Sequence, residues 1–359
     1  KKKNDICVLW DGANAGEFYR LRIKGVISST SAIILRDTIN PIVNKDYLFY
    51  FLKFYEIELK SSSIGMGIPH VDSFKMKNDV ISFPSLKKQN IIVTELNSKT
   101  KKIGVLITET QQSIEELKKY KQSLITEAVT KGLDPNVEME QLGSFELPKH
   151  WNLTSLGRLF MFMGGYSYKS DEFIGESDNQ VIRISNVKDY KFELNKNPVF
   201  ISDELAIQTE NYKIKQHDIL FTMTGTKGKR DYFFTKLVDK KEIKGRNLFL
   251  NQRVGIMRPL ITDISLKFYN YTLKVDFILE QVFQNETGTA NQGNIGIEET
   301  KKVKVFKPPI EEQRQIVSYL DEQTSRIDKL IADKTKVIEE LEDYKKSLIY
   351  EYVTGKKEV

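Results

Sequence analysis

The stretch IEELKKYKQSLI at residues 114–125 recurs as IEELEDYKKSLI at residues 338–349. The likeness continues without a gap over 45 positions, from Leu86–Thr130 to Ile310–Thr354, and 20 of these positions are identical. A repeat of this length at a constant offset indicates a duplicated architecture in which both copies take the same structure.

Both copies carry the pattern of a long amphipathic helix. Apolar residues fall three and four positions apart, with charged residues between them. Prolines precede the two copies, at Pro84 and at Pro308-Pro309, and glycines follow them at Gly132 and Gly355, as is usual at the two ends of a helix. Each helix would be roughly 65 Å long, so its apolar stripe needs a partner helix.

The charges of the two copies favour pairing with each other. Residues 86–130 contain eight lysines and five glutamates, a net charge of +3. Residues 310–354 contain seven basic and eleven acidic residues, a net charge of −4. Opposite charges favour pairing between the copies over self-pairing. A helical hairpin inside one domain is the alternative, although a long stretch of mixed sequence separates the copies.

A mixed α/β module precedes each helix. In residues 151–300, short β-patterned runs alternate with Gly, Asn and Asp turns, and one helix is predicted over Ser265–Phe283. Residues 132–150 are expected to form a linker. The fold class is therefore α/β (α+β), with long helices predicted at residues 86–131 and 301–359.

The first module, residues 1–85, resembles only the later part of the second. Residues 4–8 match 217–221, and residues 47–54 match the helix that begins near Leu266. Residues 65–84 match 288–308. No counterpart of Trp151–Gln216 is found, so either the first module lacks its front half or that half lies outside this sequence.

Composition sets broad limits on function. The 55 basic residues nearly balance the 49 acidic ones, and the net charge of +6 permits a nucleic-acid partner without requiring one. Cys7 is the single cysteine, and no apolar run approaches the ~20 residues of a membrane span. The first six residues do not read as a signal peptide. A cytoplasmic protein is expected.

Known catalytic motifs are missing. The three histidines stand at scattered positions, and a structural role is expected for each. No phosphate-binding glycine loop, dinucleotide fingerprint or amino-methyltransferase signature is present. Asp239, Glu242 and Lys244 have the spacing of a nuclease core, but they lie in a turn-rich basic stretch and are expected at the surface. The sequence predicts no catalytic site and no metal site.

One region does suggest nucleic-acid contact. Between Lys227 and Arg258 there are ten Lys and Arg against three acids, interleaved with aromatic residues, and phosphate contact needs such charge. Base edges are read by Arg, Asn, Gln, Ser and Thr. A solvated loop is the alternative for each residue. The candidates in the second module are Thr222, Thr224, Lys227, Lys229, Arg230, Arg246, Asn247, Asn251, Gln252 and Arg253.

The first module offers an equivalent loop at residues 10–14, where Trp10 could equally belong to the core. Its candidate DNA-contacting residues are Asn14, Arg20, Arg22, Lys24 and Ser29, the last within the run Ser28–Ser31. A polar, Gly-rich stretch at residues 287–294 is either a further DNA loop or a hinge between domains.

The order of module, long helix, module, long helix resembles the specificity (S) subunits of type I restriction–modification enzymes. The local motifs that carry the resemblance are Leu147-Pro148-x-x-Trp151, Leu156-Gly157, Gly164-Gly165, Asp218-Ile219-Leu220, and Pro308-Pro309-Ile310-Glu-Glu-Gln313. The resemblance covers the whole chain, and the Pro-Pro-x-x-Glu-Gln helix start within a duplicated frame is its most specific part. The first module departs from the family pattern because its front half is missing.

The resemblance implies a subunit without catalytic activity. Each module would be a target recognition domain that reads one half of a split DNA site, and the two helices would pack antiparallel as a coiled-coil spacer. Two methyltransferase subunits would bind this subunit, and translocase–nuclease subunits would join through them. S-adenosylmethionine, ATP and Mg²⁺ would belong to those partners, so no cofactor is expected in this chain.

A duplicated subunit that binds two copies of one partner should carry duplicated docking surfaces. The candidate partner-binding residues on the two helices are Glu115, Glu116, Tyr120, Glu339, Glu340 and Tyr344. Two other functions stay open. One is a coiled-coil adaptor whose modules bind proteins, and the other is an enzyme with an unrecognised site.

Overall fold

The computed structural model describes residues 3–34, 43–61, 69–188, 191–289 and 291–358. The chain divides into two compact units. Unit 1 comprises Lys1–Glu116 and Lys329–Val359, and unit 2 comprises Leu117–Asp328. The long helices α3 (Leu86–Lys131) and α9 (Ile310–Val353) each contribute one end to each unit.

Unit 1 is a three-stranded antiparallel sheet covered by one helix. The strands follow the order β2-β1-β3. The helix α1 begins after Asn44, whose Oδ1 accepts the backbone N–H groups of Asp46 and Tyr47 at 2.8 and 3.0 Å and so caps the helix. The elements of this module are β1 (Ile6–Leu9), β2 (Phe18–Arg20), β3 (Ser31–Ile33), α1 (Lys45–Ser61) and α2 (Ser73–Asn78).

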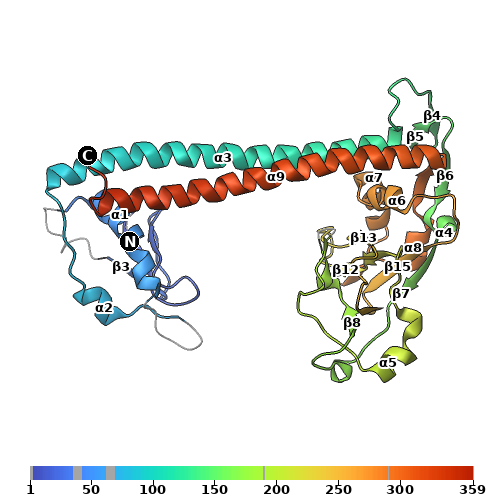
Figure 1. Ribbon diagram of the computed structural model, residues 1–359, viewed down its shortest axis with the longest axis horizontal. Helices are drawn as coiled ribbons and strands as arrows, with labels where there is room; N and C mark the ends of the chain where they lie inside the picture. The colour runs from blue at the N-terminus through green and yellow to red at the C-terminus, as the bar shows by residue number, and fades with distance from the viewer. Residues whose placement is uncertain (1–2, 35–42, 62–68, 189–190, 290, 359) are drawn as a thin grey trace. The chain divides into compact units, whose positions relative to one another are not determined.

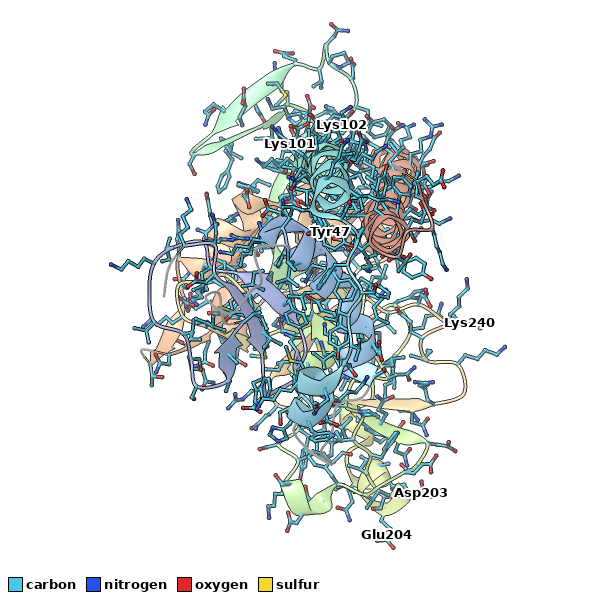
Figure 2. All side chains as sticks on the ribbon, turned by 90° about the vertical axis from the view of Figure 1, so that its left-hand side faces the viewer. Tyr47, Lys101, Lys102, Asp203, Glu204 and Lys240 are labelled. Carbon is cyan, nitrogen blue, oxygen red and sulfur yellow. The ribbon has the colours of Figure 1, made fainter. Side chains whose placement is uncertain are left out.

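The core of unit 1 lies between its sheet and α1. On α1, Leu48, Leu52, Tyr55 and Leu59 fall three and four residues apart and are buried, so one face of the helix packs on the sheet. Tyr47 points toward the long helices instead (Figure 2), and its hydroxyl donates to the carbonyl of Val353 at 3.1 Å.

Unit 2 has a four-stranded antiparallel sheet in the order β13-β11-β15-β7. Smaller pairings surround it: β14 with β8 in parallel, and β18-β6, β4-β5, β10-β9 and β12-β17-β16 antiparallel. Strands β4 to β10 are Met139–Leu142, Phe145–Pro148, Asn152–Ser155, Phe160–Gly164, Asn179–Ile182, Val187–Lys188 and Lys191–Phe192. Strands β11 to β15 are Ile219–Thr222, Thr224–Gly225, Thr235–Leu237, Asn247–Leu250 and Val254–Pro259. Strands β16 to β18 are Thr287–Thr289, Gln292–Asn294 and Lys304–Lys307.

The helices of unit 2 pack in one core with the ends of the long helices, except α5 (Asp203–Gln208), which lies away from them (Figure 1). They are α4 (Leu156–Leu159), α5 (Asp203–Gln208), α6 (Leu266–Thr272), α7 (Asp276–Phe283) and α8 (Ile297–Lys302), and three short 3-10 helices lie at Ser170–Glu172, Ile184–Asn186 and Glu210–Tyr212. One core holds α6, α7 and the ends of α3 and α9, and a second core lies between β8, β14 and the sheet.

Within each unit the two long helices lie side by side (Figure 1). In unit 1, Ile92, Val93 and Leu96 of α3 share a core with Leu348 and Ile349 of α9. In unit 2, the residues at the matching positions of the repeat also share a core: Ile316, Val317 and Leu320 of α9 lie with Leu124 and Ile125 of α3. The start of each helix therefore packs against the end of the other, which is antiparallel pairing.

Three expectations need correction. The second long helix begins at Ile310 and not at 301, because residues 304–307 form β18 and pair with β6. The predicted linker at residues 132–150 contains the hairpin β4-β5, in which Leu147 is fully buried. The single helix predicted over Ser265–Phe283 is two helices, because the chain leaves helical geometry at Val275 before α7 begins.

The sheet of unit 1 corresponds to three of the four strands of unit 2. The register pairs Val8 with Phe18 and Ala32, as it pairs Phe221 with Thr235 and Gly255. Strands β1, β2 and β3 are thus the counterparts of β11, β13 and β15. Loop hydrogen bonds agree: Trp10 N donates to Thr30 O at 2.7 Å, and Met223 N donates to Arg253 O at 3.0 Å. The strand β7 has no counterpart among the described residues of unit 1.

Candidate nucleic-acid interface

A basic loop leaves the sheet of unit 2 after β11. This basic loop, residues 226–231, carries Lys227, Lys229 and Arg230, all exposed. Two carboxylates give it a defined shape. Asp231 accepts the N–H and the hydroxyl of Thr226 at 2.7 and 2.8 Å. Burial opposes ionisation of Asp231, but these hydrogen bonds outweigh it and lower the pKa of the carboxyl.

The second carboxylate is that of Glu286. It accepts the backbone N–H of Gly228 at 3.1 Å and the hydroxyl of Tyr232 at 2.5 Å. Burial and this hydrogen bond raise the pKa of Tyr232 above its usual value, so the hydroxyl stays a donor at neutral pH. The two acids thus bond to backbone and hydroxyl groups, and the side chains of the three cations are exposed.

The Gly-rich stretch at residues 287–294 lies beside the basic loop. It forms β16 and β17, and β17 pairs with Thr224 and Gly225 of β12. Lys227 Nζ donates to the carbonyl of Gly288 at 3.2 Å. The described residues of the stretch are therefore part of the same small sheet as the start of the loop.

A second group of candidates lies next to this loop. Asn251, Gln252 and Arg253 form the turn between β14 and β15, and the backbone of Arg253 bonds to Met223, just ahead of Thr224. Gln252 and Arg253 are exposed. The structure thus brings residues 224–230 and 251–253 together at one end of the sheet.

Three predicted residues take other positions. Arg246 and Asn247 lie at the opposite end of β14, about 13 Å of strand away from the turn at 251–253. Thr222 is only 2% exposed, and its Oγ1 accepts the N–H of Phe234 at 3.0 Å. Thr222 is therefore buried in the sheet, and it is one of the residues that line the groove at Thr224.

The structure adds residues that the sequence did not single out. A groove of about 290 Å³ is lined by Thr224 and Asp231 together with Ser185, Lys188 and Lys196. The Oγ1 atom of Thr224 is buried without a hydrogen-bond partner among the described residues. Ser185, Lys188 and Lys196 stand 39, 36 and 28 residues before Thr224 in the chain, on the 3-10 helix at 184–186, on β9 and after β10. No local sequence pattern could therefore connect them with Thr224.

Unit 1 presents the equivalent end of its own sheet. Asn14 lies in the loop between β1 and β2, and Ser29 lies in the turn before β3, at the position of Gln252 in unit 2; both are exposed. Arg22 and Lys24 are exposed as well. Arg20 is engaged in the fold: it pairs with Asp46 at 2.6 Å and stacks over Phe49 at 4.3 Å from the ring centre.

Each module is attached to the long helices by the same buried glutamine. In unit 1, Gln89 Nε2 donates to the carbonyl of Pro84 at 2.8 Å, and its Oε1 accepts the N–H of Asn44 at 2.7 Å. In unit 2, Gln313 makes the same two bonds, to Pro308 and to Ser265, both at 2.8 Å. We call this pair the glutamine anchors.

A tyrosine adds a second matched attachment. Tyr50 donates to Asn97 at 2.7 Å and lies 3.2 Å from the Thr100 hydroxyl. Tyr271 donates to Asp321 at 2.8 Å and lies 3.3 Å from the Thr324 hydroxyl. Burial and then the contacts with Asp321 raise the pKa of Tyr271 to about 12. The repeated residues of the helices are thus the residues that hold the modules.

The candidate partner-binding residues are all at the surface. Tyr120 and Tyr344, at equivalent positions of the repeat, are 58% and 55% exposed. The glutamates are exposed too: Glu115, Glu116, Glu339 and Glu340. In unit 2, Tyr120 lines a groove of about 690 Å³ together with Leu124, Val137, Met139 and Tyr319.

The described residues show neither a metal site nor a membrane-spanning helix. Among them, no cluster of three or more His, Cys, Asp or Glu side chains is arranged to hold a metal ion. No helix in the described ranges is long and apolar enough to cross a membrane. The histidines make single polar contacts, such as His70 with Asp11 at 2.6 Å and His150 with Glu312 at 2.8 Å.

The sequence matches a known family. The profile described as the type I restriction modification DNA specificity domain matches residues 1–118 and 148–340. The type I restriction enzyme MjaVIII specificity subunit of Methanocaldococcus jannaschii is 30% identical over 356 residues, which cover 99% of this chain and 79% of that protein. The type I restriction enzyme EcoBI specificity subunit of Escherichia coli is 21% identical over 290 residues, 78% of this chain and 58% of its own length.

A solved structure agrees on the fold. A chain of the structure described as "Structural basis underlying complex assembly and conformational transition of the type I R-M system" aligns with a TM-score of 0.71 at 15% identity, covering 98% of this chain and 82% of that one. The protein therefore belongs to the type I restriction–modification DNA specificity family. It is a non-catalytic DNA-recognition subunit, and such subunits work with DNA and with other subunits of the complex.

Proposed function

We propose that the two modules read the two halves of a split DNA target through equivalent ends of their sheets. In the second module the contacting groups are the basic loop, residues 226–231, and the turn at residues 251–253. The observation that carries this proposal is the convergence of these two segments, which are distant in sequence, beside the groove at Thr224. In the first module the corresponding contacts come from the loop with Asn14 and the turn with Ser29.

The roles within this interface follow from side-chain chemistry. Lys227, Lys229 and Arg230 contact phosphates, because flexible cations at the end of an exposed loop give affinity without sequence information. Asn251, Gln252 and Arg253 read base edges, because amide and guanidinium groups match the donor and acceptor pattern of the major groove. Ser185 and Thr224 add short hydroxyl contacts from the groove.

The experiment compares Lys229→Ala with Lys240→Ala in the assembled methyltransferase complex. Lys240 is exposed on the turn after β13 (Figure 2). Because Leu237 pairs with Ile219 at the start of β11, this turn lies at the other end of the sheet from the basic loop. Loss of Lys229 should weaken binding to all DNA sequences alike and lower the slope of log affinity against log salt by about 0.9. Lys240→Ala should leave both quantities unchanged. Equal slopes for the two variants would remove the basic loop from the interface.

Sequence discrimination is tested separately with Gln252→Ala. The variant should lose roughly 1–3 kcal/mol of preference for the cognate site over a site changed at one base pair, while binding to random DNA persists. A uniform loss on cognate and random DNA would instead make Gln252 a phosphate contact.

We further propose that two methyltransferase subunits dock on the equivalent surfaces around Tyr120 and Tyr344, and that translocase–nuclease subunits join through them. Four residues of this surface, at 120, 123, 124 and 127, are identical in the second copy at 344, 347, 348 and 351. Exposed tyrosines are frequent binding hot spots.

S-adenosylmethionine, ATP and Mg²⁺ then belong to the partners. The cytoplasm is the proposed location, and a single cysteine, which allows no internal disulfide, supports it.

Light-scattering mass of the purified complex tests the docking. Tyr120→Ala and Tyr344→Ala should each remove one methyltransferase subunit from the complex at micromolar concentration, and the double variant should remove both. Tyr319→Phe, a change inside the same groove that keeps the ring, is the control. A complex of undiminished mass in the double variant would refute this docking surface.

A further inference from the structure

The carboxylate of Glu286 fastens the basic loop, residues 226–231, to the end of a helix. Both of its oxygens accept the backbone N–H of Gly228, Oε1 at 3.2 Å and Oε2 at 3.1 Å. Oε1 also accepts the hydroxyl of Tyr232, the residue that follows the loop, at 2.5 Å. Because Glu286 lies just after α7, one side chain joins both the middle and the end of the loop to that helix.

Aromatic contacts hold the loop at the same place. The ring of Phe283, the last residue of α7, meets the ring of Tyr232 edge-on, with the centroids 5.0 Å apart. The guanidinium of Arg230 lies 5.8 Å from the centre of the Phe283 ring. Arg230 has a φ of +50°, a left-handed conformation that residues with a side chain seldom adopt. The surroundings of the loop therefore hold its backbone in a shape that the isolated segment disfavours.

Two glycines leave the space that these contacts need. Gly225 of β12 pairs with Gly293 of β17. A Cβ added at Gly225 would lie 2.5 Å from Cδ1 of Tyr232. A Cβ added at Gly293 would lie 2.3 Å from Oε1 of Glu286 and 2.5 Å from the Tyr232 hydroxyl. An alanine at position 293 would therefore displace the carboxylate, which can move aside because it is the end of a flexible side chain.

Glu286 also places a negative charge beside the cations of the basic loop. If only charge mattered, this acid would weaken the attraction between the loop and phosphates, and its removal would tighten DNA binding. Its hydrogen bonds have the opposite effect, because a loop held in one shape before DNA arrives loses less conformational freedom on binding. The two effects differ in sign, so an experiment can separate them.

We propose that Glu286 is a positioning residue for DNA binding, which holds the three cations of the basic loop in place before they contact phosphates. This inference rests on the proposed contact between the basic loop and DNA. Glu286 acts through the backbone of Gly228 and the hydroxyl of Tyr232, and it needs no contact of its own with DNA.

DNA affinity of the assembled methyltransferase complex tests the sign of the effect. Glu286→Ala removes all of these bonds and should weaken binding about tenfold, although it removes a negative charge. Glu286→Gln keeps one oxygen that can accept the Gly228 N–H and should restore most of the affinity. Glu280→Gln is the control, because Glu280 is an exposed acid of α7 that lines a groove of about 370 Å³ with Arg230. It should bind DNA as tightly as the parent, or more tightly.

Gly293→Ala tests position without a change of charge. It should weaken DNA binding to a similar degree, whereas Gly175→Ala, where the added Cβ meets no atom within 4 Å, should have no effect. Without DNA, the amides of residues 226–231 should exchange hydrogen about tenfold faster in Glu286→Ala and in Gly293→Ala. The amides of β11 should keep their rates, which verifies that the sheet is intact.

The salt dependence separates this proposal from the function on which it rests. Glu286→Ala should keep the parent slope of log affinity against log salt, because the same cations reach phosphates in the complex. Binding by Glu286→Ala as tight as that of Glu280→Gln, or unchanged exchange in residues 226–231, would overturn the positioning role and leave phosphate contact standing. An unchanged slope in Lys229→Ala would overturn phosphate contact itself.

Discussion

In units 1 and 2 the modules are attached to the long helices in the same way, but their sheets differ in size. Both modules are attached through the glutamine anchors and through a tyrosine that bonds to the repeated helix. The sheet of unit 2 has four strands and a second core beneath it, whereas the sheet of unit 1 has three strands. The helix residues that hold a module are thus part of the repeat, while the modules themselves differ in the number of their strands.

The largest expected effect comes from removing the glutamine anchors. Gln89 and Gln313 are 1% and 0% exposed. Replacing either by alanine leaves a buried N–H and a buried proline carbonyl without their partner and should cost about 2–4 kcal/mol in the affected unit. Hydrogen exchange at the start of α1 and of α6 measures the two losses separately.

The exposed Gln112 supplies the control, since Gln112→Ala should change stability by less than about 0.5 kcal/mol. Similar losses in the two units would establish that the attachments are equivalent in energy as well as geometry. A large loss for Gln313→Ala with none for Gln89→Ala would show that the first module is held by other contacts.

A smaller contrast is expected between two equivalent lysines. In unit 1, Lys53 pairs with Glu56 at 2.5 Å and donates to the carbonyl of Phe18 at 3.0 Å. In unit 2, burial lowers the pKa of Lys274 to about 8, and the nearby Lys236 and Lys121 add to the shift. Between pH 8 and the ordinary lysine pKa of 10.5, Lys274 is protonated in the unfolded chain and neutral in the folded chain. The stability of unit 2 should therefore rise with pH in this window.

Urea unfolding between pH 7 and 10, followed by Trp151 fluorescence in a Trp10→Phe background, measures this rise. Lys274→Met should abolish it and stabilise unit 2 at pH 7 by roughly 2–3 kcal/mol. Lys53→Met should instead destabilise unit 1, because it removes the partner of Glu56. Parallel pH profiles for Lys274→Met and the parent protein would contradict the assignment.

The smallest effect concerns an ion pair that only one copy can form. In unit 2, Lys121 pairs with Asp328 across the long helices at 2.6 Å. The equivalent positions in unit 1 are Lys345 and Gly104, and a Cβ added at Gly104 meets no atom within 4 Å. Gly104→Asp should form the same pair and stabilise unit 1 by about 0.2–1 kcal/mol relative to Gly104→Asn.

The asparagine variant has the same shape and backbone preference without the charge, so the difference isolates the ion pair. Thermal unfolding at low salt and at 1 M salt measures it, and the difference should vanish at high salt. A difference that survives 1 M salt would have another origin.

The long helices and the strands of the sheet could be predicted because their signals are local. The apolar spacing of the repeat predicted α3 and α9, and short β-patterned runs predicted strands within residues 151–300. The pairing of β18 with β6 could not be predicted, because Lys304–Lys307 becomes a strand only beside residues about 150 positions earlier. The break before α7 was missed for a similar reason: Leu273 and Val275 are both fully buried, and packing overrides the continuous helical pattern.

In the candidate site, too, only the residues with a local sequence signal could be predicted. Composition identified the exposed cations of the basic loop, since charge density is visible in the sequence. Composition could not separate Thr222, which is buried, from Thr224 two residues later, because alternation along a strand does not distinguish residues two apart and only the contacts of the folded sheet do. Ser185, Lys188 and Lys196 join the site through tertiary packing.

The position of the glutamine anchors has a consequence for inheritance. Each anchor lies at the fourth position of a 45-residue segment that occurs twice in the chain with 20 identities. An exchange of genetic material within that segment would deliver a different module already joined to a helix with the matching glutamine, tyrosine partner and threonine. New DNA preferences could then arise by reassortment of whole modules, without any intermediate whose module is badly attached.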